Sequence, residues 1–133
     1  MSYEDLGSGI NFNNMPCIYW SNTTKMNYLQ RRVIVYSIMY YENNESCISD
    51  REYDAISYQL LDLMNASTQE EKEATTYWYA MHDFDASTGF DIPGRLKKKD
   101  KEYLTHIAGY VYKLWKDNSS NEERRRRMSN AKS

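Results

Sequence analysis

Three tyrosines and two aspartates lie close together in the first half of this chain, and their types and spacing suit one kind of ligand. Tyr40 and Tyr41 are adjacent, and Asp50, Tyr53 and Asp54 follow at intervals of three and four. On a helix these intervals bring Asp50, Tyr53 and Asp54 to one face. Aromatic rings stack on cations, and carboxylates accept hydrogen bonds from hydroxyl groups. The set therefore predicts a pocket for a flat cationic ring that carries a sugar diol.

Two helices joined by a short loop must position these side chains. Apolar residues recur at helical intervals over residues 24–43, which predicts the first helix, and the polar run 42–46 breaks it. Ser49 and Glu52 have the spacing of a capping box, which predicts the start of a second helix over residues 50–64. We expect the tyrosine pair at the end of the first helix to face the first turns of the second.

The same stretch resembles part of a known family. The run Leu29–Tyr41, followed by Ile48–Asp54 and Leu60–Leu63, is similar to the N-terminal NMN-binding cap (subdomain Ia) of bacterial NAD-dependent DNA ligases. In that family the cap is a small helical subdomain that grips the nicotinamide mononucleotide (NMN) half of NAD. The resemblance covers residues 26–64 and matches the family's order of tyrosine pair, loop, aspartate and tyrosine–aspartate without a gap. It implies a ligase-cap-like helix–loop–helix.

The resemblance also implies a role for each residue of the set. Tyr40 and Tyr41 would take the positions that contact the nicotinamide ring. Asp50, Tyr53 and Asp54 would take the ribose, phosphate and ring-edge positions. NAD or NMN is accordingly the expected ligand.

The catalytic parts of those ligases have no counterpart in this sequence. Their nucleophilic lysine lies in a Lys-x-Asp-Gly motif, whereas Lys98-Lys99-Asp100 here continues to Lys101. A zinc finger, helix-hairpin-helix repeats and a nucleotidyltransferase core are also missing, and no Ser/His/Asp or Cys/His set has helpful spacing. We therefore expect a non-catalytic, stand-alone protein and not an enzyme.

Structural roles explain part of the same set. Asp50 lies in the first turn of its helix, where a carboxylate complements the helix dipole, and Tyr53 fits an apolar stripe. Asp54 lies in the second turn, where the dipole contributes little. Asp54 is therefore the residue that most needs a ligand to explain it.

The middle of the chain predicts a third helix with an alternative. Ser67 and Glu70 repeat the capping-box spacing, which indicates a helix over residues 68–84. Residues 75–79 also have strand propensity, so a short hairpin near 75–92 stays open.

The last part of the chain predicts a loop, a helix and a tail. Residues 83–96 form the loop, with turns at Thr88–Gly89 and Pro93–Gly94. A fourth helix covers residues 98–116 and ends at Asn118–Asn121. Its predicted buried face consists of Tyr103, Ile107, Tyr110, Val111, Leu114 and Trp115.

These elements define the expected fold: mainly α, with about four helices and an irregular N-terminal arm. The arm covers residues 1–22, with Ile18–Trp20 as its anchor. The helical domain covers residues 23–118, and residues 119–133 form a polar and basic tail.

Composition narrows the class of protein. Charged residues make up 27% and hydrophobic residues 41%, which is typical of a globular chain. The net charge of −2 favours neither nucleic acid nor membrane, and only Arg124–Arg127 offers a cluster for phosphates. No apolar stretch approaches ~18 residues and no secretory signal is visible, so we expect a cytoplasmic protein. A lone cap would suit a phage-encoded protein in a bacterial host.

A metal site is not expected. Cys17 and Cys47 lack metal-ligand spacing and are expected to stay reduced. His82-Asp83-x-Asp85 offers donors, but such polar loops are common without an ion.

Two functional hypotheses follow, from different classes. The first is a module that binds NAD or NMN and modulates a NAD-using or DNA-processing enzyme. The second is a protein–protein interaction module, an inhibitor or adaptor without a small-molecule ligand. The 13 tyrosines, in a chain without a catalytic set, motivate the second, because tyrosine is enriched at protein interfaces.

Overall fold

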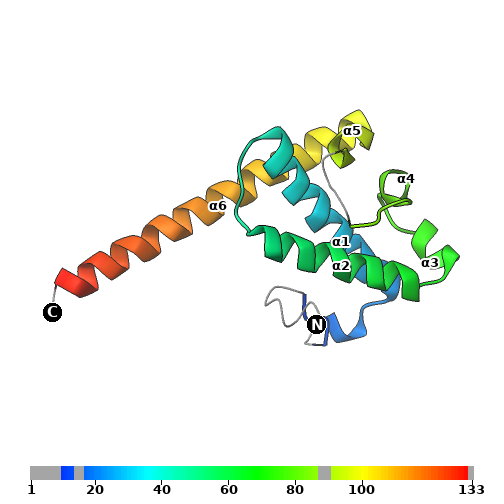
Figure 1. Cartoon of the computed structure of the whole chain (residues 1–133), viewed down its shortest axis with the longest axis horizontal. Coiled ribbons are helices and arrows are strands. Elements are labelled where there is room, and N and C mark those ends of the chain that lie inside the picture. The colour runs from blue at the N-terminus through cyan, green and yellow to red at the C-terminus, as the bar shows by residue number, and fades with distance from the viewer. Residues whose placement is uncertain (1–9, 14–16, 87–90, 132–133) are drawn as a thin grey trace.

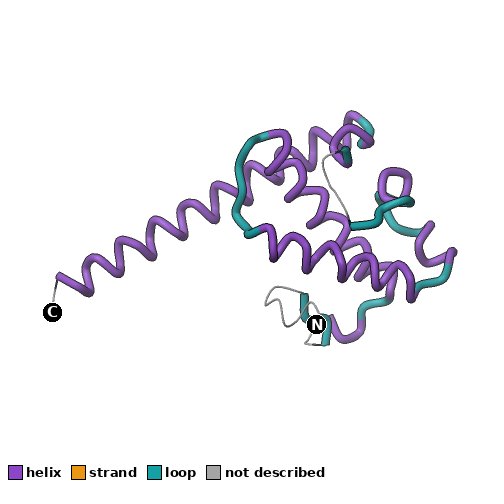
Figure 2. The backbone as a smooth tube through the Cα atoms, viewed as in Figure 1, coloured by secondary structure: helices purple, strands orange, loops and turns teal. Residues whose placement is uncertain are grey.

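The computed structural model describes residues 10–13, 17–86 and 91–131, with side chains described as far as Arg126 in the last range. The predicted mainly α fold is confirmed, and the described residues contain no strand (Figure 2). Three helices are long: α1 (Asn22–Ser37), α2 (Asp50–Ala66) and α6 (Lys98–Ala131). The remaining elements are short: a 3-10 turn η2 (Cys17–Tyr19), a π-helical turn η3 (Ile38–Glu42), α3 (Gln69–Glu73), α4 (Trp78–Met81) and α5 (Ile92–Arg95).

Helix α1 is the centre of the fold. Its last residues are buried all round: every residue from Val33 to Ser37 is inaccessible or nearly so, and the burial continues to Met39 in η3, as expected of a helix covered on several sides. Helix α2 packs along one side, and the first turns of α6 cross the other (Figure 1). The core is completed by Ile56 and Leu60 of α2, Leu104 and Ala108 of α6, and Met81 and Ile92 of the short helices.

The predicted helix–loop–helix is present with shifted ends. Helix α1 begins two residues before the predicted start, at Asn22, because the Ser21 hydroxyl accepts the Thr24 amide at 3.2 Å. Helix α2 begins at Asp50 as predicted, where the Ser49 hydroxyl accepts the Glu52 amide at 3.1 Å. The turn between the two helices brings the C-terminal end of the first beside the N-terminal end of the second.

The continuous third helix was a wrong prediction. The capping box uses Thr68 and Glu71, one residue later than predicted, and α3 ends at Glu73. Side chains of α1 then capture the next residues: Gln30 Nε2 donates to the Thr75 hydroxyl at 3.0 Å, and Asn27 accepts the Thr76 amide at 2.8 Å. These tertiary bonds hold the chain in a turn before α4 begins.

The hairpin near residues 75–92 is also absent from the part of the chain that the structure describes. Tyr77 is buried in the core instead of pairing in a sheet. Pro93–Gly94, predicted as a turn, lies inside α5, where proline suits the first turn of a helix. Thr88–Gly89 lies outside the described residues.

Helix α6 does not end at Asn118–Asn121, and the predicted stop is wrong. It continues to Ala131, so the basic run belongs to the same helix (Figure 1). Glu122 and Glu123 precede arginines by four residues, the orientation that stabilises a helix. No helix in the described part of the chain combines the length and apolarity needed to cross a bilayer.

The buried face of α6 also differs from the predicted one. Leu104 and Ala108 are fully buried, whereas four of the six predicted residues are exposed: Tyr103, Tyr110, Leu114 and Trp115. Only the first turns of α6 reach the body of the protein, and the rest projects beyond it (Figure 1). An apolar stripe on the projecting part therefore has no core to join.

The described residues of the N-terminal arm are tied to α1 and α2. Gln59 of α2 accepts the Ile10 amide at 2.8 Å and donates to the Ile10 carbonyl at 2.7 Å. Trp20 packs against Tyr28 with ring centroids 5.7 Å apart. The predicted anchor Ile18–Trp20 is correct only for Trp20, because Ile18 and Tyr19 are exposed.

Candidate functional site

A pocket opens where η3 turns into α2, and all five predicted site residues line it. Its volume is about 290 Å³. Its wall is made by the last turn of α1, η3, the following loop, the first turns of α2, and one residue from far along the chain. The lining residues are Tyr36, Met39, Tyr40, Tyr41, Ser46, Cys47, Ile48, Ser49, Asp50, Tyr53, Asp54 and Ala86.

The π-helical turn positions the tyrosine pair. The Asn43 amide donates to the Ile38 carbonyl at 3.1 Å, five residues back, and the Glu45 amide donates to the Met39 carbonyl at 2.9 Å. Asn44 ends the turn with a φ of 52°, a left-handed conformation that asparagine tolerates better than most residues. Single π turns are rare and frequent at functional sites.

Tyr40 and Tyr41 form an open corner. Their ring centroids lie 4.8 Å apart and their planes meet at 82°. The two side chains are 51% and 46% exposed. Two nearly perpendicular rings of this kind offer one face and one edge to a flat ligand, and both remain accessible from solvent.

Tyr53 lines the pocket, and its hydroxyl already forms a hydrogen bond within the protein. Its hydroxyl lies 2.8 Å from the Ser37 Oγ, and Ser37 donates its own proton to the Val33 carbonyl at 2.8 Å. Tyr53 must therefore be the donor of this pair. Burial raises the pKa of the Tyr53 phenol, so it stays neutral. The bond directs the Tyr53 hydroxyl toward α1 and leaves its ring for the pocket.

Asp50 and Asp54 lie at the rim, one helical turn apart on α2. Both are exposed, and among the described residues neither forms an ion pair. Like charges four residues apart on a helix repel each other and destabilise it slightly. The rim therefore concentrates negative charge that a cation would relieve.

Cys47 is a site residue that the sequence did not single out. It is a half-buried free thiol that lines the pocket. Burial raises the pKa of the Cys47 thiol, and the nearby Arg32 guanidinium partly opposes this rise. Arg32 is held between two α1 tyrosines, donating to Tyr28 at 2.9 Å and to Tyr36 at 2.6 Å. Only the fold could place Cys47 and Ala86 at the pocket.

The raised pKa makes a prediction about the reactivity of Cys47. The thiolate is the reactive form, so a raised pKa leaves less of it at a given pH. We expect the rate of iodoacetamide alkylation at Cys47, followed by peptide mass spectrometry, to rise at a higher pH than for an ordinary thiol of pKa about 8.5. A rate that levels off below that pH would contradict the burial of the thiol.

One of the metal donors weighed above, Asp83, is engaged in an ion pair. Asp83 forms an ion pair with Arg95, which also bonds Asp91 at 2.8 Å. Within residues 10–13, 17–86 and 91–131, no group of three His, Cys, Asp or Glu residues has a geometry that could hold an ion.

Comparisons with protein-family models, with curated proteins and with solved structures find no match to this chain. The site must therefore be interpreted from its own geometry and chemistry.

Proposed function

We propose that this protein binds the nicotinamide mononucleotide part of NAD in the pocket between η3 and α2. The observation that carries the proposal is that Tyr40, Tyr41, Asp50, Tyr53 and Asp54 all line this one pocket. Three aromatic rings and two carboxylates that form no ion pair with any described residue surround a small cavity, which suits a flat cation with hydroxyl groups. The resemblance to a ligase cap names a ligand with this chemistry, the NMN half of NAD.

The pocket size favours half of NAD. Pockets for small molecules range from about 300 to 1,000 Å³, and this pocket, at about 290 Å³, lies at the lower end. The nicotinamide ring would lie in the corner of Tyr40 and Tyr41, with the ribose hydroxyls toward Asp50 and Asp54. The adenosine half would lie outside, so NMN and NAD should bind with similar affinity.

The proposal assigns no catalytic step to the chain. A protein that holds the nicotinamide nucleotide without acting on it would modulate a NAD-using or DNA-processing enzyme by competing for the ligand or presenting it. Either role requires only that the pocket bind reversibly.

Titration calorimetry with NMN and with NAD tests the proposal. We expect one binding event for each ligand, and at least tenfold weaker binding in Tyr40→Ala, because the cation loses the ring beside it. Tyr58→Ala is the matched control: Tyr58 is an equally exposed tyrosine on α2, away from the pocket, and its loss should change nothing.

A second readout guards against binding without heat. A bound ligand should slow the alkylation of Cys47 but not of Cys17, which does not line the pocket. The absence of heat and of Cys47 protection at millimolar ligand would refute the proposal.

A further inference from the structure

The solvent face of α6 carries aromatic side chains that the core does not use. Tyr103, His106, Tyr110 and Lys113 recur at intervals of three and four, so they share one face of the helix. That face is opposite the one that packs Leu104 on the body. Tyr103 is 55% exposed and Tyr110 62% exposed. Two large rings on the outer face of a helix need an explanation other than folding.

A shallow groove runs along this face, with a glycine at its floor. An added Cβ at Gly109 would meet no heavy atom within 4 Å. Glycine inside a helix destabilises it relative to alanine, so the fold bears a cost at Gly109 without a packing benefit. The missing side chain leaves room for the close approach of a group from outside. The groove, of about 840 Å³, is lined by Lys98, Lys101, Glu102, Thr105, His106, Gly109, Tyr110 and Lys113.

Helix α6 is basic, whereas the remainder of the chain is acidic. The sequence of α6 contains nine lysines and arginines against five acidic residues, a net charge of +4. The other residues then hold eight basic against fourteen acidic ones, a net charge of −6. Because like charge repels and opposite charge attracts over the whole surface, a polyanion would be steered to α6 and away from the body.

We propose that α6 binds single-stranded nucleic acid along its solvent face. Bases would stack on Tyr110 and Tyr103, with one base seated in the gap above Gly109. Phosphates would contact Lys98 and Lys113. This class of partner is favoured because exposed rings on which bases can stack, flanked along the helix by cations for the phosphates, suit a single strand.

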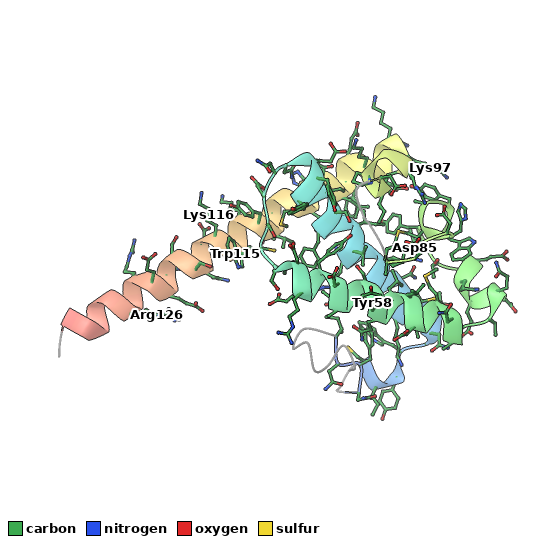
Figure 3. All side chains as sticks on the ribbon, in the orientation of Figure 1. Tyr58, Asp85, Lys97, Trp115, Lys116 and Arg126 are labelled. Carbon is green, nitrogen blue, oxygen red and sulfur yellow. The ribbon has the colours of Figure 1, made fainter. Side chains whose placement is uncertain are left out.

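The projecting part of α6 adds exposed cations beyond this face, on other sides of the helix. Lys116 and Arg126 lie on the portion of the helix that stands clear of the body (Figure 3). At about 1.5 Å per residue, the 34 residues of α6 span about 50 Å, which is long enough for a strand of several nucleotides. Glu102 and Asp117 on the helix oppose a polyanion, and Lys101 is paired with Glu42 at 3.3 Å. The affinity should therefore be moderate and sensitive to salt.

Fluorescence anisotropy with the full chain tests the proposal. The probe is a labelled single strand of about fifteen thymidines, within the range of single-strand sites. We expect saturable binding at about 50 mM salt and at least tenfold weaker binding at about 200 mM salt, because phosphate contacts release counterions. The double variant Tyr103→Ala/Tyr110→Ala should weaken binding at least tenfold. Tyr58→Ala, the loss of an exposed tyrosine elsewhere, should not.

A second variant separates binding from folding. Gly109→Leu should raise the melting temperature, since leucine is the better helix former and its Cβ would meet no heavy atom within 4 Å, yet weaken oligonucleotide binding at least tenfold by filling the groove. Tyr40→Ala should leave oligonucleotide binding unchanged, so this proposal and NMN binding can fail independently.

Four results would overturn the proposal. They are no binding at the lower salt, full binding by both α6 variants, equal affinity for an abasic strand of the same length, and a concentration-dependent dimer in sedimentation that Gly109→Leu dissolves. Equal affinity for the abasic strand would mean that α6 binds phosphates through charge alone. A dimer that Gly109→Leu dissolves would mean that the groove binds a second copy of the chain.

Discussion

Leu104→Ala should lower the free energy of unfolding by about 2–5 kcal/mol, the range seen when a fully buried leucine is truncated. Leu104 has no exposed surface and belongs to the core cluster of the body. Its truncation leaves a cavity where α6 joins the body, and a dense interior does not collapse to fill it. Urea denaturation followed by circular dichroism measures the change.

Leu114→Ala is the matched control for this prediction. Leu114 lies on the same helix but is 45% exposed, on the part that leaves the body. The same substitution there should cost about 1 kcal/mol or less, because little apolar area is removed from contact. Equal losses for the two variants would mean that the projecting part of α6 is packed in solution, contrary to the structure.

Neutralising both rim carboxylates should weaken NMN binding by about ten- to thirtyfold. Asp50 and Asp54 are exposed, so each contributes near the high-dielectric limit of about 1 kcal/mol at 4 Å from a cation. Since about 1.4 kcal/mol is tenfold in affinity, the two together account for the range. Asp50→Asn/Asp54→Asn keeps the shape of both side chains and removes only the charge. Calorimetry at low salt measures the change.

The thermal stability of Asp50→Asn/Asp54→Asn shows whether a loss of NMN affinity is local to the pocket or results from unfolding of the protein. Losing Asp50 removes a favourable charge from the first turn of α2, whereas losing Asp54 relieves the repulsion between the pair. These effects are of similar size and opposite sign, so the melting temperature should barely change. Asp62→Asn, an exposed carboxylate on α2 outside the pocket, is the control for charge alone. An equal loss of NMN affinity in Asp62→Asn would contradict a specific role for the rim carboxylates Asp50 and Asp54.

Much of the pocket could be predicted from local patterns. Helical spacing puts Asp50, Tyr53 and Asp54 on one face, and the Ser49 cap sets where that helix begins. Because a short loop joins the two helices, the tyrosine pair could lie only near that face. Interactions between residues close in sequence decide all of this.

Other features depend on residues far apart in the sequence. Thr75 and Thr76 leave the helical pattern because Gln30 and Asn27 of α1 bond them. The Tyr53 hydroxyl is occupied because Ser37 lies opposite it. Sequence patterns within one segment do not reveal such partners. The helix propensity of a segment is weaker than the hydrogen bonds that it forms with residues of another helix.

By itself, the sequence determined the helical class, the hairpin of α1 and α2, and the five residues that share the pocket, because caps and periodicity act over one or two turns. Only the tertiary structure decided the π turn, the entry of Cys47 and Ala86 into the wall, and the division of α6 into a buried start and a projecting end. The sequence of α6 shows the same apolar periodicity whether or not other helices pack against it. The extent of the core, which depends on how the other helices pack, decides which of its residues are buried.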